Sequence, residues 1–559
     1  MPPLDPLTVA LVLLAAAAIY LVRARKRHSA PLPPGPSALP LIGNLWHVPL
    51  RHPWLAFTDW ANTYGDVVHL HGLGLSIVLL NSVPAVTELL DRRATVYSHR
   101  PVFPMVGQMM ALDSSMPLMD YGPAWRFHRK LVRAALAPEA VRKYRPLQEQ
   151  LAVLMAQLFL VRPAEFDDHI RLCAFPSSHC AVGTSADATA DDEETMDMIS
   201  RSTVPGAYLV DFFPQMKRLP RWLPFTGFFA KGDAGRAMIA RLVTKPFLAV
   251  KAQMASPLPL SFCAPAAGSA VPSVTRDLLE DAARDGRAQD DFETQVKWAA
   301  GALYGAGGET TYTTVLVFVA LMALHPAQQA RVHAELDRVV GADRLPALAD
   351  RGRLPYLEAA INEAMRWHPA LYVPFPSPLP LLWWGNADGL FGGRPLSIAR
   401  RTAADDVYDG KFIPAGTLVL PNVWALSRDA HGAPSDAFAP ERFLDAAGTG
   451  AGATDPSSYA FGFGRRICPG KYLAENSVFI MIATLLACFD FAPPADRPLE
   501  LRFATGLVRY FALIPSKFSA MGADVVGGGS YPQPYECRIT PRSEARAKLL
   551  EHAAALCEV

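Results

Sequence analysis

The chain has 559 residues, 51% of them hydrophobic, which is sufficient for one large domain or for several smaller ones. Its 53 basic and 52 acidic residues nearly cancel, so no charge excess points to a nucleic-acid partner. The seven cysteines are scattered, odd in number and form no CxxC pair. That usage argues against a disulfide framework and a zinc site, and it favours a reducing compartment.

Residues 1–28 are predicted to form a membrane anchor followed by a basic stop. The run LTVALVLLAAAAIYLV at 7–22 carries no charge, and RARKRH follows it at 23–28. As a helix the run spans roughly 24 Å, a little less than a typical hydrocarbon core. The alternative, a cleaved signal peptide, requires positive charge before the apolar run, whereas here the charge follows it. The positive-inside rule then places residue 23 onward in the cytosol.

Behind the anchor, residues 29–44 form a proline-rich hinge, because prolines favour a stiff, extended spacer. Residues 45–559 show no repeats and no second linker, so they are predicted to form one large domain. The pattern is mainly α with small β-sheets, and a turn at 414–416 joins the second pair of strands. Helices are expected at 124–160, 292–324, 327–340, 354–367 and 471–490, and strand pairs at 67–80 and 411–421.

The helix expected at 292–324 is almost uniformly apolar, as a buried helix should be. Glu309 and Thr310 interrupt it beside Gly305, Gly307 and Gly308. Because glycine costs a helix about 1 kcal/mol relative to alanine, these glycines indicate that something approaches the backbone. The alternative is ordinary helix packing, with the threonine bonded back to its own helix.

Two further stretches carry charges at informative positions. Glu363 and Arg366 are three residues apart, so they share a helix face and can form an ion pair. Arg442 would complete a buried network of three charges. The alternative is an ordinary surface pair, which contributes only a few tenths of a kcal/mol.

The loop FGFGRRICPG, residues 461–470, places Cys468 just before a predicted helix. Backbone N–H groups and the helix dipole stabilise a thiolate at such a position. Gly464 and Gly470 would let the backbone approach a flat partner and turn N–H groups towards the sulfur, while Arg466 would neutralise an anion. A thiolate held in this way suits a soft metal or haem iron. The alternative is a small buried hydrophobic residue, the usual role of a lone cysteine.

Together these motifs resemble the cytochrome P-450 family of haem-thiolate monooxygenases, fungal microsomal type. The signature F-x-x-G-x-R-x-C-x-G is met in full by Phe461, Gly464, Arg466, Cys468 and Gly470. Four other segments match in family order, and the resemblance covers residues 31–550. These segments are Trp125-x-x-x-Arg129, AGGETT at 306–311, EAMR at 363–366 and FAPERF at 438–443, and the hinge and YSHRP at 97–101 are also similar.

The resemblance implies the cytochrome P-450 fold with haem b, iron protoporphyrin IX, and Cys468 as the axial ligand of the iron. It implies that Glu309 and Thr310 deliver protons during oxygen activation. It also implies that Glu363, Arg366 and Arg442 form a structural network that positions the thiolate loop. Trp125 and Arg129 would meet a haem propionate, and Arg400 aligns with a position that often does so. The alternative for both arginines is a solvated surface residue.

The function implied is insertion of one oxygen atom from dioxygen into an apolar substrate, in fungal secondary or xenobiotic metabolism. The enzyme would lie in the endoplasmic reticulum membrane with one span, in contact with lipid and with its catalytic domain in the cytosol. Electrons would come from a separate NADPH-dependent reductase, since no flavin or nicotinamide fingerprint follows a strand. One alternative is a haem-thiolate isomerase or dehydratase without a reductase, against which Glu309 and Thr310 argue. The other is a catalytically inactive haem protein.

Three stretches look inserted between segments that match the family: 257–269, 374–397 and 511–530. Each lacks helix or strand periodicity and is rich in glycine or proline. The second stretch places Trp383 beside Trp384, which on a surface would promote aggregation or membrane contact. It is interpreted as translated intron sequence in a gene model, and the chain as written would then bind haem poorly. The alternative is a working lid or a loop that dips into the membrane.

Overall fold

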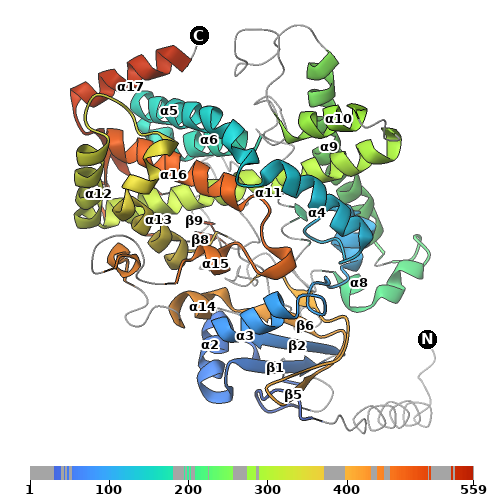
Figure 1. Cartoon of the computed structure of the whole chain (residues 1–559). Helices are drawn as coiled ribbons and strands as arrows, with labels where there is room; N and C mark the ends of the chain where they lie inside the picture. Colours follow the sequence, from blue (N-terminus) through green and yellow to red (C-terminus); the bar gives the residue numbers. More distant parts are fainter. Residues whose placement is uncertain are drawn as a thin grey trace, which may run out of the picture.

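The computed structural model describes the chain from residue 30 to residue 557 with gaps, of which the longest are 180–193, 256–272, 371–396 and 505–530. Figure 1 shows helices massed on one side and a small sheet on the other, with α11 (Gln289–Leu324) running between them. The predicted anchor at 1–28 lies outside the described residues. So do the stretches 257–269 and 511–530, and all of 374–397 except its last residue.

The predicted helices form, with one division. Proline at 138 disfavours helical backbone at Ala137, so the run expected at 124–160 separates into two helices, α4 and α5. The other predicted helices begin and end within a few residues of their expected bounds. The principal helices are α2 (Pro53–Tyr64), α4 (Pro123–Leu136), α5 (Arg145–Val161), α6 (Phe166–His179), α9 (Phe228–Ala255), α10 (Val274–Arg284), α12 (Pro326–Val339), α13 (Pro355–Trp367), α14 (Val423–Asp429), α16 (Lys471–Cys488) and α17 (Glu544–Cys557).

The largest sheet has the strand order β1-β2-β6-β3. β1 (Val67–Gly72) and β2 (Leu75–Leu80) form the predicted antiparallel pair, β6 (Leu418–Pro421) runs parallel to β2, and β3 (Arg400–Arg401) closes the sheet. The described residues also form three two-stranded sheets: β4 (Asp406–Tyr408) with β5 (Lys411–Ile413), β7 (Phe489–Ala492) with β10 (Arg538–Pro541), and β8 (Phe503–Ala504) with β9 (Tyr531–Pro532).

The prediction that the strands at 411–421 pair with each other was wrong. β5 pairs with β4, whereas β6 joins the large sheet. The turn between them is held by Thr402, whose Oγ1 donates to the carbonyl of Pro414 at 2.8 Å and accepts from the N–H of Thr417 at 2.9 Å. These bonds direct β6 towards β2 instead of back along β5.

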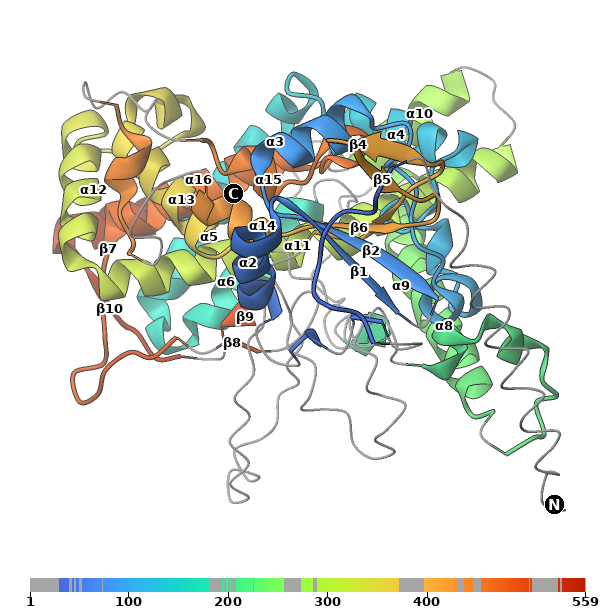
Figure 2. The same cartoon turned by 90° about the horizontal axis from the view of Figure 1, so that it is seen from below.

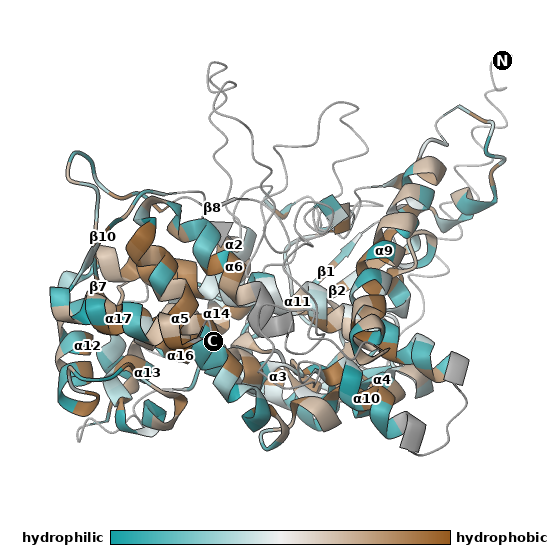
Figure 3. Ribbon diagram, turned by 90° about the horizontal axis from the view of Figure 1, so that it is seen from above, coloured by the Kyte–Doolittle hydropathy of each residue, from teal (hydrophilic) through white to brown (hydrophobic). Residues whose placement is uncertain are grey.

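The core consists of two large apolar clusters that share α11. Its C-terminal part, from Tyr312 to Ala323, packs with α5, α6, α13 and α16, while Val296 to Tyr304 packs with α4, α9 and α10. Apolar residues therefore concentrate on the inner helices, and α12 and α17 carry polar outer faces (Figure 3). Among the described residues, α11 and α16 are long and apolar enough to span a membrane, but 78% of each apolar window is buried, which identifies them as core helices.

The described part of the proline-rich hinge packs against the domain instead of standing away from it. The carbonyl of Pro31 accepts from the N–H of Phe412 at 2.7 Å, and the carbonyl of Pro34 accepts from His69 at 2.8 Å. A Cβ at Gly35 would lie 2.1 Å from the carbonyl oxygen of His69, so only glycine permits this approach. The folded domain therefore begins before residue 45.

Candidate active site

A cavity of about 600 Å³ lies between α11 and the loop that carries Cys468. α11 lines it from Gly301 to Thr314, a segment that overlaps the end of one core cluster and the start of the other. Gly305 and Gly307 belong to this lining. A cavity with a mostly apolar surface and convergent polar groups is the usual form of a small-molecule site.

Cys468 faces this cavity, so its thiol is accessible although protein surrounds it. Its backbone N–H donates to the carbonyl of Phe461 at 2.8 Å, which closes the loop just before α16. Burial raises the pKa of the Cys468 thiol, and the backbone N–H groups of Gly470 and Lys471 and the charge of Arg129 oppose that rise. A sulfur that faces a cavity and receives N–H groups is suited to bind a metal as the thiolate.

Gly464 acts differently from the prediction. It is not part of the cavity lining, and it adopts φ +52° at the start of η12 (Gly464–Arg466). A Cβ there would lie 2.0 Å from the carbonyl oxygen of Leu90 in η2 (Thr87–Arg92). Glycine is therefore required for packing of the loop against η2, not for approach to a flat ligand. Gly470 lines the cavity, and a Cβ there would make an ordinary contact at 3.9 Å with the Cys468 sulfur.

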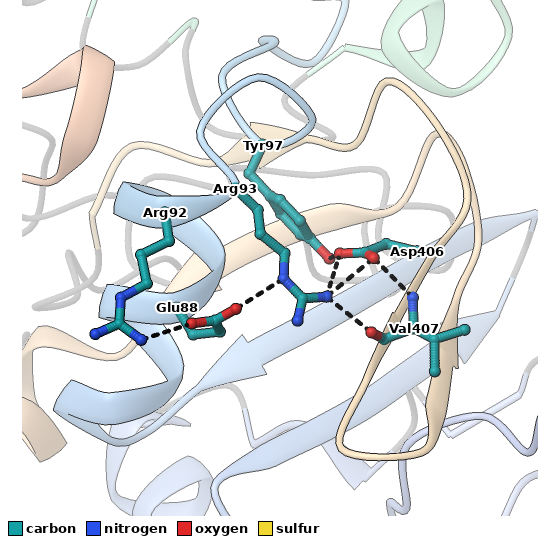
Figure 4. A network of polar contacts seen from close by, with 6 residues as sticks. All are labelled: Glu88, Arg92, Arg93, Tyr97, Asp406 and Val407. Atoms are coloured by element: carbon teal, nitrogen blue, oxygen red, sulfur yellow. Dashed lines mark hydrogen bonds and ion pairs between the residues drawn. The ribbon is translucent and has the colours of Figure 1, made fainter.

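Polar contacts in turn fasten the end of η2 to the β4–β5 hairpin (Figure 4). Arg93 bridges Glu88 and Asp406, each at 3.0 Å, and donates to the carbonyl of Val407 at 2.7 Å. Tyr97 donates its hydroxyl to Asp406 at 2.9 Å, and burial raises the pKa of that tyrosine. Since η2 supports the cysteine loop through Leu90, this network holds the loop indirectly.

Arg400 is the strongest sign of an anionic ligand at the cavity. Its side chain is 1% exposed, and its Nη2 donates to the carbonyl of Phe463 at 2.5 Å. Its Nε and Nη1 have no hydrogen-bond partner among the described residues, and burial lowers its pKa to about 10. Buried guanidinium groups are normally paired, so this one fits an acidic group of a bound cofactor.

Two more arginines, the partly buried Arg466 and the buried Arg100, lie beside Arg400. Arg466 donates to the carbonyls of Ser98, Met116 and Met119, and burial and then Arg400 lower its pKa to about 9. Arg100 donates to backbone carbonyls as well, and burial together with Arg466 and Arg400 lowers its pKa. Three guanidinium groups around one cavity repel one another, and a dianionic ligand would relieve that repulsion. Arg100 was not predicted as a site residue, although it lies in the YSHRP motif.

The predicted pair on α4 borders the same cavity. Trp125 and Arg129 both line it, and the guanidinium of Arg466 lies 4.6 Å from the centre of the Trp125 ring. Arg129 donates to the carbonyl of Ile467 at 2.6 Å, next to the cysteine. The two residues lie on one face of α4, as their i,i+4 spacing predicts, and both contact the cysteine loop.

Thr310 lines the cavity, and its Oγ1 donates to the carbonyl of Ala306 at 3.1 Å. Glu309 is buried but does not line the cavity, because successive helical residues point about 100° apart. Thr314, one turn beyond Thr310, also lines the cavity and donates to the carbonyl of Thr310 at 2.9 Å. Sequence reasoning missed Thr314, and its i+4 spacing from Thr310 was the available signal.

Glu363, Arg366 and Arg442 meet away from the cavity. Arg366 donates through Nε and Nη2 to the two carboxylate oxygens of Glu363 at 2.6 and 2.9 Å, and both side chains are 0% exposed. The Nε of Arg442, in η11 (Pro440–Phe443), lies 2.9 Å from the same carboxylate. The N–H of Ala439 adds a bond at 2.8 Å, so the network joins α13 to the segment around η11.

A cysteine thiol that faces a cavity rimmed by guanidinium groups fits a haem-thiolate protein, and comparison with known proteins shows the family. The cytochrome P-450 family model matches residues 33–376 and 393–519. The chain therefore belongs to the cytochrome P-450 family, as the motifs predict. It is a monooxygenase of that family, and its cofactor is haem b.

Its relatives include cytochrome P-450 monooxygenase claR of Ampulloclitocybe clavipes, 34% identical, covering 97% of this chain and 92% of that protein. Cytochrome P-450 monooxygenase 136 of Postia placenta is 32% identical and covers 98% of this chain and 96% of that protein. A zebrafish cytochrome P-450 structure with abiraterone has a TM-score of 0.62 at 24% identity, and the match covers 88% of this chain and 100% of that chain. This likeness confirms the predicted fold.

The residues that the family model matches can be compared with the three stretches that look inserted. It is interrupted at 377–392, inside the predicted insertion at 374–397. The matched range includes 257–269, and it ends at 519, inside 511–530. The family match therefore leaves 377–392 of the second stretch unmatched, and it also leaves the third stretch unmatched from residue 520 onward.

Proposed function

We propose that this enzyme inserts one oxygen atom from dioxygen into an apolar organic substrate, with electrons from a separate NADPH-dependent reductase. The observation that carries the proposal is the cavity wall beyond the cysteine loop. Apolar side chains from three parts of the fold gather there: Leu112, Met116, Leu118, Ile239, Leu242, Val243 and Leu303. Such a wall favours an uncharged, apolar ligand. Because the relatives are fungal monooxygenases, we propose that the substrate belongs to fungal secondary or xenobiotic metabolism.

We assign Cys468 as the axial ligand, and Arg400, with Arg129 and Trp125, to the propionates. The bound haem supplies reductive activation of dioxygen. Thr310 would hold a proton at its Oγ1 on the cavity side, where the hydroxyl now bonds to Ala306. Glu309, beside it and off the cavity, would supply protons from within α11.

We further propose attachment to the endoplasmic reticulum membrane through residues 1–28. A second surface supports membrane contact: Leu209 in α8 (Leu209–Phe212), Phe213 and Trp222 are exposed, the last to 80%. Basic residues at 217, 218 and 221 lie between them along the chain and complement anionic lipid. Deleting residues 1–28 is expected to move much of the protein to the soluble fraction with haem retained. A truncated protein that stays wholly on membranes would place the main attachment elsewhere.

The test of the catalytic proposal has two stages. A screen of apolar compounds for shifts of the haem absorption band identifies ligands of the purified full-length protein. Each ligand is then incubated with NADPH and a cytochrome reductase, and products are identified by mass. An added oxygen atom that requires NADPH supports the proposal. A rearranged product formed without reductase would favour an isomerase or dehydratase, and bound ligands that are never converted would indicate an inactive haem protein.

A further inference from the structure

A short helix, η3 (Pro104–Met109), lies directly before one wall of the cavity along the chain. It leads directly into η4 (Leu112–Ser114) and on to Leu118, which supply cavity-lining residues. Met105 and Val106 are buried, but a helix of this length cannot hold its own ends, because most of its terminal N–H and C=O groups lack partners within it. Its position therefore depends on the elements that contact it.

Two oppositely charged side chains from other parts of the chain form hydrogen bonds with the two ends of η3. At the first turn, the N–H of Met105 donates to Oδ1 of Asp211 in α8 at 3.0 Å. At the last turn, Arg236 in α9 donates through Nη2 to the carbonyl of Gln108 and through Nε to that of Met109, both at 2.9 Å. An anion at the N-terminal end and a cation at the C-terminal end each match the helix dipole. Burial raises the pKa of Asp211 to about 6, which means that the ionised carboxylate is less favourable there than in water.

The flank of η3 fits closely against α9. A Cβ at Gly235 would lie 2.8 Å from Cγ and Sδ of Met110, and one at Gly232 would lie 3.1 Å from Cε of Met109. The glycines therefore let α9 approach until backbone meets methionine side chains. α9 itself supplies Ile239, Leu242 and Val243 to the cavity, so two of its walls are joined at this contact. α8 and α9 lie together at one edge of the molecule (Figure 2).

We propose that Asp211 and Arg236 are positioning residues for the substrate, because they clamp η3 between them and thereby set how readily the wall from Leu112 to Leu118 yields to a bulky ligand. Neither residue lines the cavity, so both act through η3. The inference rests on the proposed function, in which that wall contacts an apolar substrate. Loosening the clamp lowers the cost of moving the wall, and it affects a large ligand more than a small one.

The experiment compares two ligands that bind haem iron through nitrogen, imidazole and the bulky clotrimazole, by stopped-flow absorbance on the full-length holoprotein. In Arg236→Ala and in Asp211→Ala the association rate of clotrimazole is expected to rise by up to about tenfold, equivalent to about 1.4 kcal/mol, while that of imidazole stays within twofold of the wild type. Asp211→Asn retains an oxygen that accepts from Met105 and is expected to restore most of the wild-type rate. Arg241→Ala, an exposed arginine of the same helix, is the control.

The proposal is overturned if the clotrimazole rate of Arg236→Ala matches that of Arg241→Ala, or if both azole rates rise equally. Should Arg236→Ala fail to incorporate haem, Arg236→Lys and Asp211→Ala carry the same comparison, because Arg236→Lys retains the charge with fewer donors and Asp211→Ala leaves Arg236 in place. A wild-type protein that shows no absorption shift with either azole would reject the haem site itself, and that result is distinct from an unchanged ratio of rates.

Discussion

Replacing Glu363 by glutamine is expected to destabilise the fold strongly. The carboxylate receives Arg366 at 2.6 and 2.9 Å and lies 2.9 Å from Arg442, and the Glu363 and Arg366 side chains are 0% exposed. Glutamine removes the negative charge and turns an NH₂ group towards guanidinium donors. Breaking one partner of a buried pair leaves an uncompensated charge and costs about 3–5 kcal/mol. Arg442 is 11% exposed and keeps some solvation, so most of the loss arises at Arg366.

The assay is guanidinium chloride unfolding of the holoprotein, followed by tryptophan fluorescence and by haem absorbance. Glu139→Gln is the matched control, because Glu139 pairs with Arg142 at the same i,i+3 spacing and at 2.9 Å, but with side chains 76% and 61% exposed. An exposed pair of this kind is expected to contribute nothing measurable. If Glu363→Gln unfolds at the same midpoint as Glu139→Gln, the network is not a stabilising element and the reasoning is refuted.

Three further predictions concern the thiolate, proton delivery and pH. Cys468→Ala should abolish the strongly red-shifted ferrous carbon monoxide spectrum of a thiolate ligand, whereas Cys537→Ala should retain it; a retained spectrum in the first variant would contradict the assignment. Thr310→Ala should keep haem but form less product and more hydrogen peroxide per NADPH, and unchanged coupling would refute its role. Hydrogen bonds from Arg344 lower the pKa of Asp350 to about 2, below its usual 3.8, so its stabilisation is present above pH 4 and is lost as the pH falls towards 2. Asp350→Asn should therefore be less stable than the wild type by roughly 2 kcal/mol at pH 7, with the difference vanishing near pH 2, and a constant difference would contradict this account.

The side-chain neighbours that the sequence predicts and the structure shows depend on short-range spacing. Glu363 and Arg366 meet because three residues along a helix bring side chains to one face, and Trp125 and Arg129 border one cavity because four residues do the same. The helix bounds followed from apolar periodicity for the same reason. Pro138 divided the expected helix at 124–160 because its ring restricts the residue before it, a signal that the printed sequence contains.

Glycine positions were harder to interpret from the sequence. The spacing of Gly464 in the cysteine motif indicates an unusual backbone, and its φ of +52° agrees. What the glycine approaches is the carbonyl of Leu90, in a segment far away along the chain. The motif therefore shows that this position requires glycine. Only the tertiary structure shows which atom a larger side chain would meet.

The sequence by itself determined the family, the helical character and the local ion pair, because these depend on residue type and on spacing within one element. Only the tertiary structure decided which distant groups meet: Arg100 beside Arg400 and Arg466, β6 beside β2, and η3 between Asp211 and Arg236. Each of these contacts joins segments more than one hundred residues apart. No local periodicity encodes such a pairing, because it is set by how whole helices and strands pack once their apolar faces are buried.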